Sequence, residues 1–144
     1  MIKSVLCAVD VSQPEVDGSV LKAAAKLAAL DNAQLDVITV VPDFGMSVVG
    51  TFFEADFHEQ AEEHAREALG EFVKATLGSE ANKKVRHIVT NGRAYEKILS
   101  AAKEANTDLI VIGSHKPEIS DYFIGPNAAR VVRHASCSVY VVRD

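Results

Sequence analysis

Short apolar runs alternate with amphipathic stretches along the whole chain. The run Ile2 to Val9 is rich in β-branched residues and is followed by the turn-rich segment DVSQPEVDG, which is typical of a buried strand. Between Glu15 and Leu30, apolar residues recur at helical spacing, which predicts a helix. The same alternation predicts further strands in QLDVITVV, KKVRHIVT, DLIVIG and CSVYVVR, and further helices in HEQAEEHAREALGEFVKATL, AYEKILSAAKEA and PNAARVVRHA.

This order of elements predicts an α/β fold. Parallel strands need a crossover that returns the chain to the same end of the sheet, and a helix is the usual crossover. We therefore expect one domain over residues 1–144, an open parallel five-stranded sheet with helices on both faces. Residues 42–57 form the only long irregular stretch, and we expect its apolar side chains to cover the sheet edge, a ligand or a partner subunit.

Composition and charge narrow the classes of protein. With 48% hydrophobic and 24% charged residues, the 144-residue chain is that of a globular domain. A net charge of −5 without clustered Lys or Arg argues against a nucleic-acid partner. No apolar run reaches the ~20 residues of a spanning helix, and the first strand starts too close to Met1 to leave room for a signal peptide. Cys7 and Cys137 form no C-x-x-C motif, so we expect reduced thiols in a cytoplasmic protein.

Candidate binding residues fall at the carboxyl ends of the predicted strands, where open parallel sheets bind ligands. Asp10 follows the first strand, Val40 lies at the end of the second, Gly113 ends the fourth, and Gly125 opens the last helix. Glycine lets the backbone approach a ligand closely, and a helix N-terminus offers N–H donors to phosphate. The pattern favours an anion or nucleotide, although a simple turn explains each glycine equally well.

Other candidates for chemistry are weaker. His115 has no Ser or Cys nucleophile and orienting carboxylate at a defined spacing, so we predict no catalytic residue. His58, Glu62 and His64 share a helix without the H-E-x-x-H spacing, which indicates a solvated face and no metal site. The chain also lacks G-x-x-x-x-G-K-[ST], and G-x-G-x-x-G after the first strand, which excludes the P-loop and Rossmann interpretations.

The two ends of the chain resemble the universal stress proteins. The segments VLCAVDVS and GSHKPEISDYFIGPNAARVVRHASCSVYVVR are similar to the family patterns ILVPVDGS and GSHGRxxxxxxLGSVAxxVLRHAxCPVLVVR, and TNGRAYEKIL is similar to the family's V-x-x-G-x-P/A segment. The chain looks most like the short single-domain bacterial members with S-H-[RK]-P after the fourth strand. This resemblance implies the sheet order 3-2-1-4-5 and a homodimer formed through the last strand.

The resemblance also implies an adenine-nucleotide site, because the nucleotide-binding branch of the family holds ATP with G-x-x-G, nine residues, then G-[ST]. On this chain, Asp10 with the adjoining Ala8 and Val9 would meet adenine and ribose, and Val40 would contact adenine. The ribose and phosphate side would comprise Ile112, Gly113, His115, Lys116, Gly125, Asn127 and Ala128, of which the last three face the phosphates.

Three departures from the family pattern affect the phosphate side. Lys116 replaces the second glycine, eight residues rather than nine separate it from Gly125, and Pro126 replaces the serine. The Lys116 ammonium could itself contact a phosphate as a point charge. Pro126 suits a helix start but deletes one N–H and one hydroxyl, each worth about 1.5–3 kcal/mol when bonded to a charged group. We therefore expect weakened phosphate contacts.

The sequence thus predicts a cytoplasmic universal stress protein that binds ATP or another adenine nucleotide, alone or with Mg²⁺, as a regulatory module in stress response. We expect at most slow ATP hydrolysis. The alternative is a nucleotide-independent dimer with a decayed phosphate cradle, which recruits an unidentified protein partner through the dimer surface or residues 42–57. An adenylating enzyme of related architecture would need an S-G-G-x-D-S loop after the first strand, and DVSQPE lacks it.

Overall fold

The computed structural model describes residues 1–42, 51–114 and 125–143, with the backbone alone described for residues 51–58 and 125. The strands are β1 (Ser4–Ala8), β2 (Gln34–Val41), β3 (Arg86–Asn91), β4 (Leu109–Ser114) and β5 (Ser138–Arg143). The helices are α1 (Pro14–Leu30), α2 (Thr51–Leu77), α3 (Ser79–Lys84), α4 (Ala94–Glu104) and α5 (Gly125–His134).

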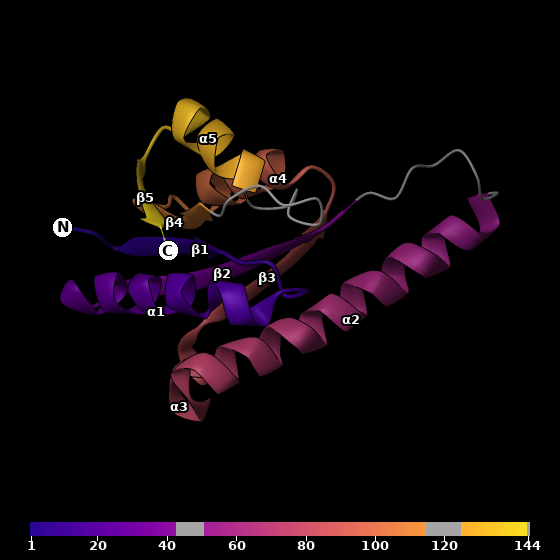
Figure 1. Cartoon of the computed structure of the whole chain (residues 1–144), viewed down its shortest axis with the longest axis horizontal. Helices are drawn as coiled ribbons and strands as arrows, with labels where there is room; N and C mark the ends of the chain where they lie inside the picture. Colours follow the sequence, from indigo (N-terminus) through magenta and orange to yellow (C-terminus); the bar gives the residue numbers. More distant parts are fainter. Residues whose placement is uncertain (43–50, 115–124, 144) are drawn as a thin grey trace.

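The five strands form one parallel sheet in the order β3-β2-β1-β4-β5 (Figure 1). The three central strands are almost continuously buried, because helices cover both of their faces. The outer strands β3 and β5 are only partly buried. The α/β class, the parallel sheet and its order are therefore confirmed.

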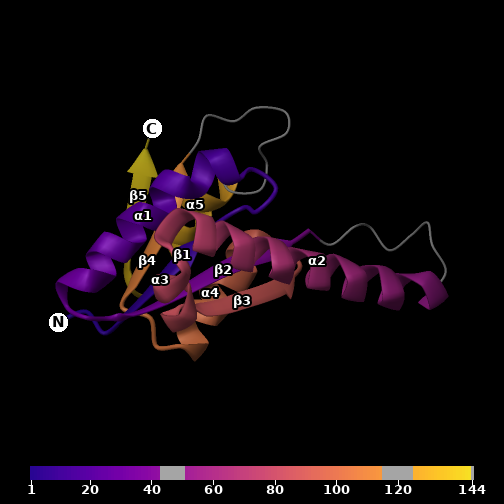
Figure 2. The same ribbon diagram turned by 90° about the horizontal axis from the view of Figure 1, so that it is seen from below.

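Helices cover the sheet in two layers, with α1 and α2 on one face and α4 and α5 on the other (Figure 2). Alternate residues of β1 supply the two cores: Val5 and Cys7 pack with α1 and α2, whereas Leu6 and Ala8 pack with α4 and α5. Among the described helices, none is long and apolar enough to cross a bilayer.

The predicted irregular stretch at residues 42–57 is partly wrong, because α2 already begins at Thr51. The segment TFFEADF contains neither proline nor glycine, and each residue added to an existing helix gains a backbone hydrogen bond. The amino-terminal part of α2 therefore extends well beyond the sheet (Figure 1). The apolar side chains expected to cover an edge or a ligand, Phe44 to Phe53, lie outside the described residues.

The sequence also missed the short helix α3. The third strand was expected from Lys83, but Lys83 and Lys84 end α3 and the strand begins at Arg86. Gly78 has a φ of +96°, a left-handed conformation that ends α2 and lets the chain turn into α3. Two helices, not one, thus connect β2 to β3.

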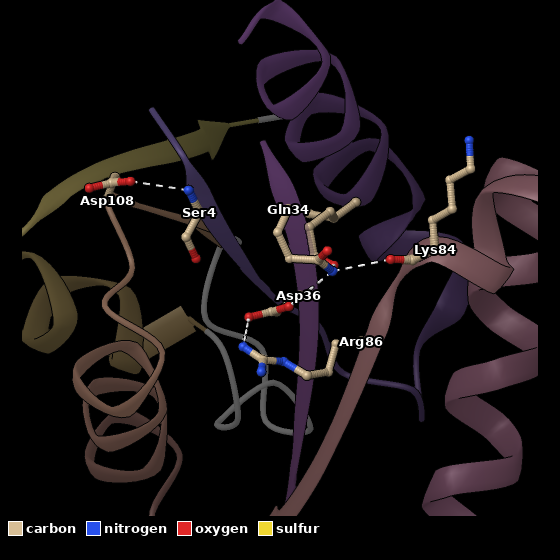
Figure 3. A network of polar contacts seen from close by, with 7 residues as sticks. Ser4, Gln34, Asp36, Lys84, Arg86 and Asp108 are labelled. Carbon is tan, nitrogen blue, oxygen red and sulfur yellow. Dashed lines mark hydrogen bonds and ion pairs between the residues drawn. The ribbon is translucent and has the colours of Figure 1, made fainter. Parts of the chain in front are cut away.

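A polar network joins the strands near their amino ends (Figure 3). The Asp36 carboxylate of β2 is completely buried, and its Oδ2 lies 2.6 Å from Nη2 of Arg86 on β3. The hydrogen bond and the charge of Asp36 raise the pKa of the Arg86 guanidinium. Gln34 Nε2 donates to the Lys84 carbonyl oxygen over 3.1 Å. These contacts fix β2 against β3 at the edge of the sheet.

The start of β4 is fastened to β1 by a second set of contacts at this end. Asp108 Oδ2 accepts the main-chain N–H of Lys3 at 2.8 Å. It also accepts that of Ser4 at 3.1 Å (Figure 3). Both amino-end networks use their polar groups internally. The opposite edge of the sheet, at the carboxyl ends of the strands, is where open parallel sheets bind ligands.

Candidate functional site

A groove of about 1450 Å³ opens at the carboxyl ends of β1, β2 and β3. This volume exceeds the roughly 300–1,000 Å³ of ordinary small-molecule sites. The groove has room for a nucleotide-sized ligand. Its walls come from five segments: residues 10–12 after β1, residues 39–42 at the end of β2, residues 92–97 at the start of α4, Asn127 and Arg130 of α5, and Gln60, Ala61, His64, Ala65 and Ala68 of α2.

Asp10 lies at the groove and organises the turn that follows β1. Its Oδ1 accepts the N–H of Ser12 at 3.0 Å and the Ser12 hydroxyl at 2.6 Å, a side-chain turn of the kind that aspartate favours. The Asp10 N–H in turn donates to Asp17 Oδ2 over 2.6 Å. Hydrogen bonds therefore hold Asp10 at both its carboxylate and its main-chain N–H.

Asp17 supports the turn that carries Asp10, and the sequence analysis missed it. It lies in the first turn of α1 and is only 1% exposed. The available signal was its spacing, because Asp17 lies three and four residues before Val20 and Leu21 on the buried stripe of the helix. Burial is the main reason that the pKa of the Cys7 thiol is raised, and the Asp17 carboxylate raises it further. Cys7 is therefore a buried core thiol of low reactivity.

The structure brings some predicted site residues to the groove and keeps others in the core. Asp10, Val40 and Asn127 line the groove. Ala8, Val9, Ile112, Gly113 and Ala128 are buried. Gly125 opens α5 as predicted, whereas His115 and Lys116 lie outside the described residues.

The first turns of α4 and α5 are joined beside the groove. Asn127 Oδ1 of α5 accepts the Tyr95 N–H of α4 at 3.0 Å, which satisfies one of the free donors of that helix N-terminus. One turn further along α5, the Arg130 guanidinium lies over the Tyr95 ring, 5.1 Å from its centre. The sequence analysis used this part of the chain only for its family spacing and missed Tyr95 and Arg130.

The turn between β3 and α4 requires its glycine. Gly92 has a φ of +126°, and its N–H donates to the Val41 carbonyl oxygen over 3.0 Å. A Cβ at this position would lie 2.9 Å from Lys97 Cε. The Lys97 stem therefore occupies the space that a side chain at position 92 would fill, and the turn stays attached to the end of β2.

The histidines give no sign of a metal centre in the described part of the chain. His64 is an exposed residue of α2 at the groove, and the side chain of His58 lies outside the described residues. In the described ranges, no three His, Cys, Asp or Glu side chains are grouped as metal ligands. The described lining of the groove combines apolar surface with two carboxylates, two side-chain amides and three Lys or Arg side chains.

Known proteins resemble the chain over its full length. Residues 1–143 match the model of the Universal stress protein family. Universal stress protein G of Shigella flexneri is 29% identical over 149 residues, covering 99% of this chain and 100% of that protein. Universal stress protein A homolog 1 of Coxiella burnetii is 30% identical over 144 residues, covering 97% and 95%.

Solved structures share the fold. Universal stress protein UspA from Lactobacillus plantarum has a TM-score of 0.76 at 22% identity, covering 99% of this chain and 98% of that one. A universal stress protein in complex with cAMP has a TM-score of 0.66 at 18% identity, covering 98% and 97%. Since the family model spans almost all of the sequence and relatives align from end to end, this chain belongs to the universal stress protein family.

Proposed function

We propose that the protein binds an adenine nucleotide, in the first place ATP, in the groove at the carboxyl ends of β1 and β2, and that it acts as a cytoplasmic regulatory module in stress response. One observation carries this proposal. Asp10, Val40 and Asn127 come from three separate elements and line the same groove, at the edge of the sheet where open α/β folds bind ligands.

The chemistry of these residues suits a nucleotide. Val40 offers an apolar surface for the base, and the Asp10 carboxylate accepts hydrogen bonds from ribose hydroxyls. The main-chain N–H groups in the first turn of α5 suit the phosphates. A universal stress protein solved in complex with cAMP supports an adenine nucleotide as the ligand class. Mg²⁺ would bridge phosphate oxygens, held mainly by the nucleotide and water.

We propose binding rather than efficient catalysis, with at most slow ATP hydrolysis. The Asp10 carboxylate is fixed by Ser12 and is placed as a hydrogen-bond acceptor. General-base catalysis would instead need a group that is free to take a proton from an attacking water. The alternative, a nucleotide-independent interaction protein, is favoured by Pro126, which removes a donor from the first turn of α5.

The test is a titration of the purified protein with ATP by calorimetry, together with native mass spectrometry for a co-purified nucleotide. Asp10→Ala should weaken ATP binding at least tenfold, about 1.4 kcal/mol. Asp31→Ala is the matched control, because Asp31 also accepts a main-chain N–H, that of Ile2 at 2.8 Å, but far from the groove. This control should bind ATP as the wild type does.

Two results would contradict the proposal. Absence of ATP binding by the wild type would favour the nucleotide-independent protein. Equal affinities of the wild type and Asp10→Ala would leave Asp10 with its turn-forming role alone. Thermal unfolding of each variant shows whether a lost affinity merely reflects a lost turn.

A further inference from the structure

The groove carries a local excess of positive charge in an acidic protein. Arg93, Lys97 and Arg130 line its α4 and α5 side, whereas the whole chain has a net charge of −5. Arg93 lies 3.8 Å from Glu96 and is partly neutralised by it. Lys97 and Arg130 form no ion pair with any residue in the described ranges. Among the described lining residues, three Lys or Arg side chains therefore face two carboxylates, and neither Lys97 nor Arg130 is ion-paired with a described residue.

The Arg130 side chain is held for binding. Its guanidinium lies 5.1 Å from the centre of the Tyr95 ring, and the Tyr95 hydroxyl donates to Glu96 Oε1 over 3.3 Å. Asn127 Oδ1 accepts the main-chain N–H of the same tyrosine. A guanidinium over the face of a ring is held by a cation–π attraction that leaves its N–H groups available. These groups can form paired hydrogen bonds to an oxyanion.

The Lys97 side chain is positioned as well. It is half-buried, and its stem lies over Gly92, which has no side chain to displace it. Its partial burial restricts the stem before any ligand arrives. A preorganised cation binds an anion at a smaller entropic cost than a free surface lysine.

We propose that Lys97 and Arg130 form a subsite for a phosphate group of the nucleotide in the groove. This inference rests on the proposed function and names a phosphate contact outside the family pattern. Arg130 lies three residues after Asn127, hence one turn from the start of α5, where Pro126 has removed a donor. The acidic lining residues cancel only part of this charge, because Asp10 and Glu96 face the three cations Arg93, Lys97 and Arg130, and Glu96 lies beside Arg93.

The test compares two double variants of the same two helices. Lys97→Gln with Arg130→Gln removes the subsite, whereas Lys103→Gln with Arg133→Gln removes equal charge from the exposed last turns of α4 and α5. Calorimetry measures the affinity of the wild type and of both variants for adenosine, AMP and ATP, at low and at high salt. The first variant should lose ATP affinity at least tenfold, keep adenosine affinity within about twofold and show a weaker salt dependence. The control variant should match the wild type.

Equal ATP affinities of the two double variants would overturn the subsite, as would an equal loss for adenosine and ATP. If the wild type binds neither adenosine nor ATP, the proposed function fails and tripolyphosphate becomes the probe. Tripolyphosphate binding that the Lys97 and Arg130 variant loses would support an anion site without a nucleotide. If the wild type does not bind tripolyphosphate either, the subsite is overturned too.

Discussion

Four aspartates hold main-chain N–H groups at the two ends of the sheet. Asp10 and Asp17 fasten the turn after β1 at the carboxyl end, and Asp31 and Asp108 fasten the first residues of the chain at the amino end. Bonds from N–H groups to a carboxylate are charge-assisted and stronger than neutral ones. Part of the acidic charge of this protein therefore belongs to its framework, and the groove can still be cationic on one side.

We predict that Asp108 contributes to the pH dependence of stability in acid. The N–H groups of Lys3 and then Ser4 lower the pKa of its carboxyl. A lowered pKa stabilises the folded state above the unfolded value, about pH 3.9, and this stabilisation is lost as the pH falls through the folded pKa. Asp108→Asn should therefore lose less stability than the wild type on acidification from about pH 5 towards pH 2. Urea unfolding across this range measures it, and parallel curves for the two proteins would contradict the prediction.

Single residues also show why the site was only partly predictable. Asp10 and Val40 could be predicted because strand ends in a parallel sheet converge on one edge. Tyr95 and Arg130 could not, because their contact joins two helices that are distant in sequence. The ion pair of Asp36 could not be predicted for a similar reason, because its partner Arg86 lies on a neighbouring strand 50 residues away.

At the scale of elements, apolar periodicity predicted nearly every helix and strand. Strand β2 covers the eight residues of QLDVITVV, and α4 differs from AYEKILSAAKEA only at its last residue. The errors concern the start of α2 at Thr51 and the short helix α3. Helix α3 buries no residue, so it carries no apolar stripe. Periodicity reports burial, so it is silent where a helix is exposed.

We predict that the residue at position 126, in the first turn of α5, affects the affinity for ATP. Pro126→Ser should return one N–H and one hydroxyl to this helix start, so ATP binding should tighten. The gain should grow from AMP to ATP, because only the longer phosphate chain reaches this turn. Helix stability should fall slightly, since proline presets the first turn.

Titration of both proteins with AMP, ADP and ATP measures this effect. Pro14→Ser is the matched control, because Pro14 opens α1 and does not line the groove. It should lower stability without changing nucleotide affinity. A gain identical for AMP and ATP, or the same gain in the control, would refute a phosphate cradle at α5.

At the scale of the whole molecule, the sheet ends in two different edges. The β3 edge carries the exposed cation Arg86, which pairs with Asp36 of β2, and it lies beside α2 (Figure 2). The β5 edge carries apolar surface, with Tyr140 47% exposed and Val132 of the adjacent α5 51% exposed. Exposed strand edges invite pairing with another chain, and charge is a common means of preventing it. The β5 edge is therefore the better candidate for contact between two copies.

We predict a two-fold dimer formed through β5, which light scattering at micromolar concentration should detect. Val141→Pro should abolish the dimer, because proline removes a ladder donor and suits no paired strand. Val89→Pro in β3 is the matched control at the opposite edge, and it should lower stability yet leave the dimer intact. Tyr140→Lys adds a charge without altering the backbone, so it should weaken the dimer while each copy stays folded. A monomeric wild type, or a dimer that survives both β5 changes, would show that β5 is not the contact.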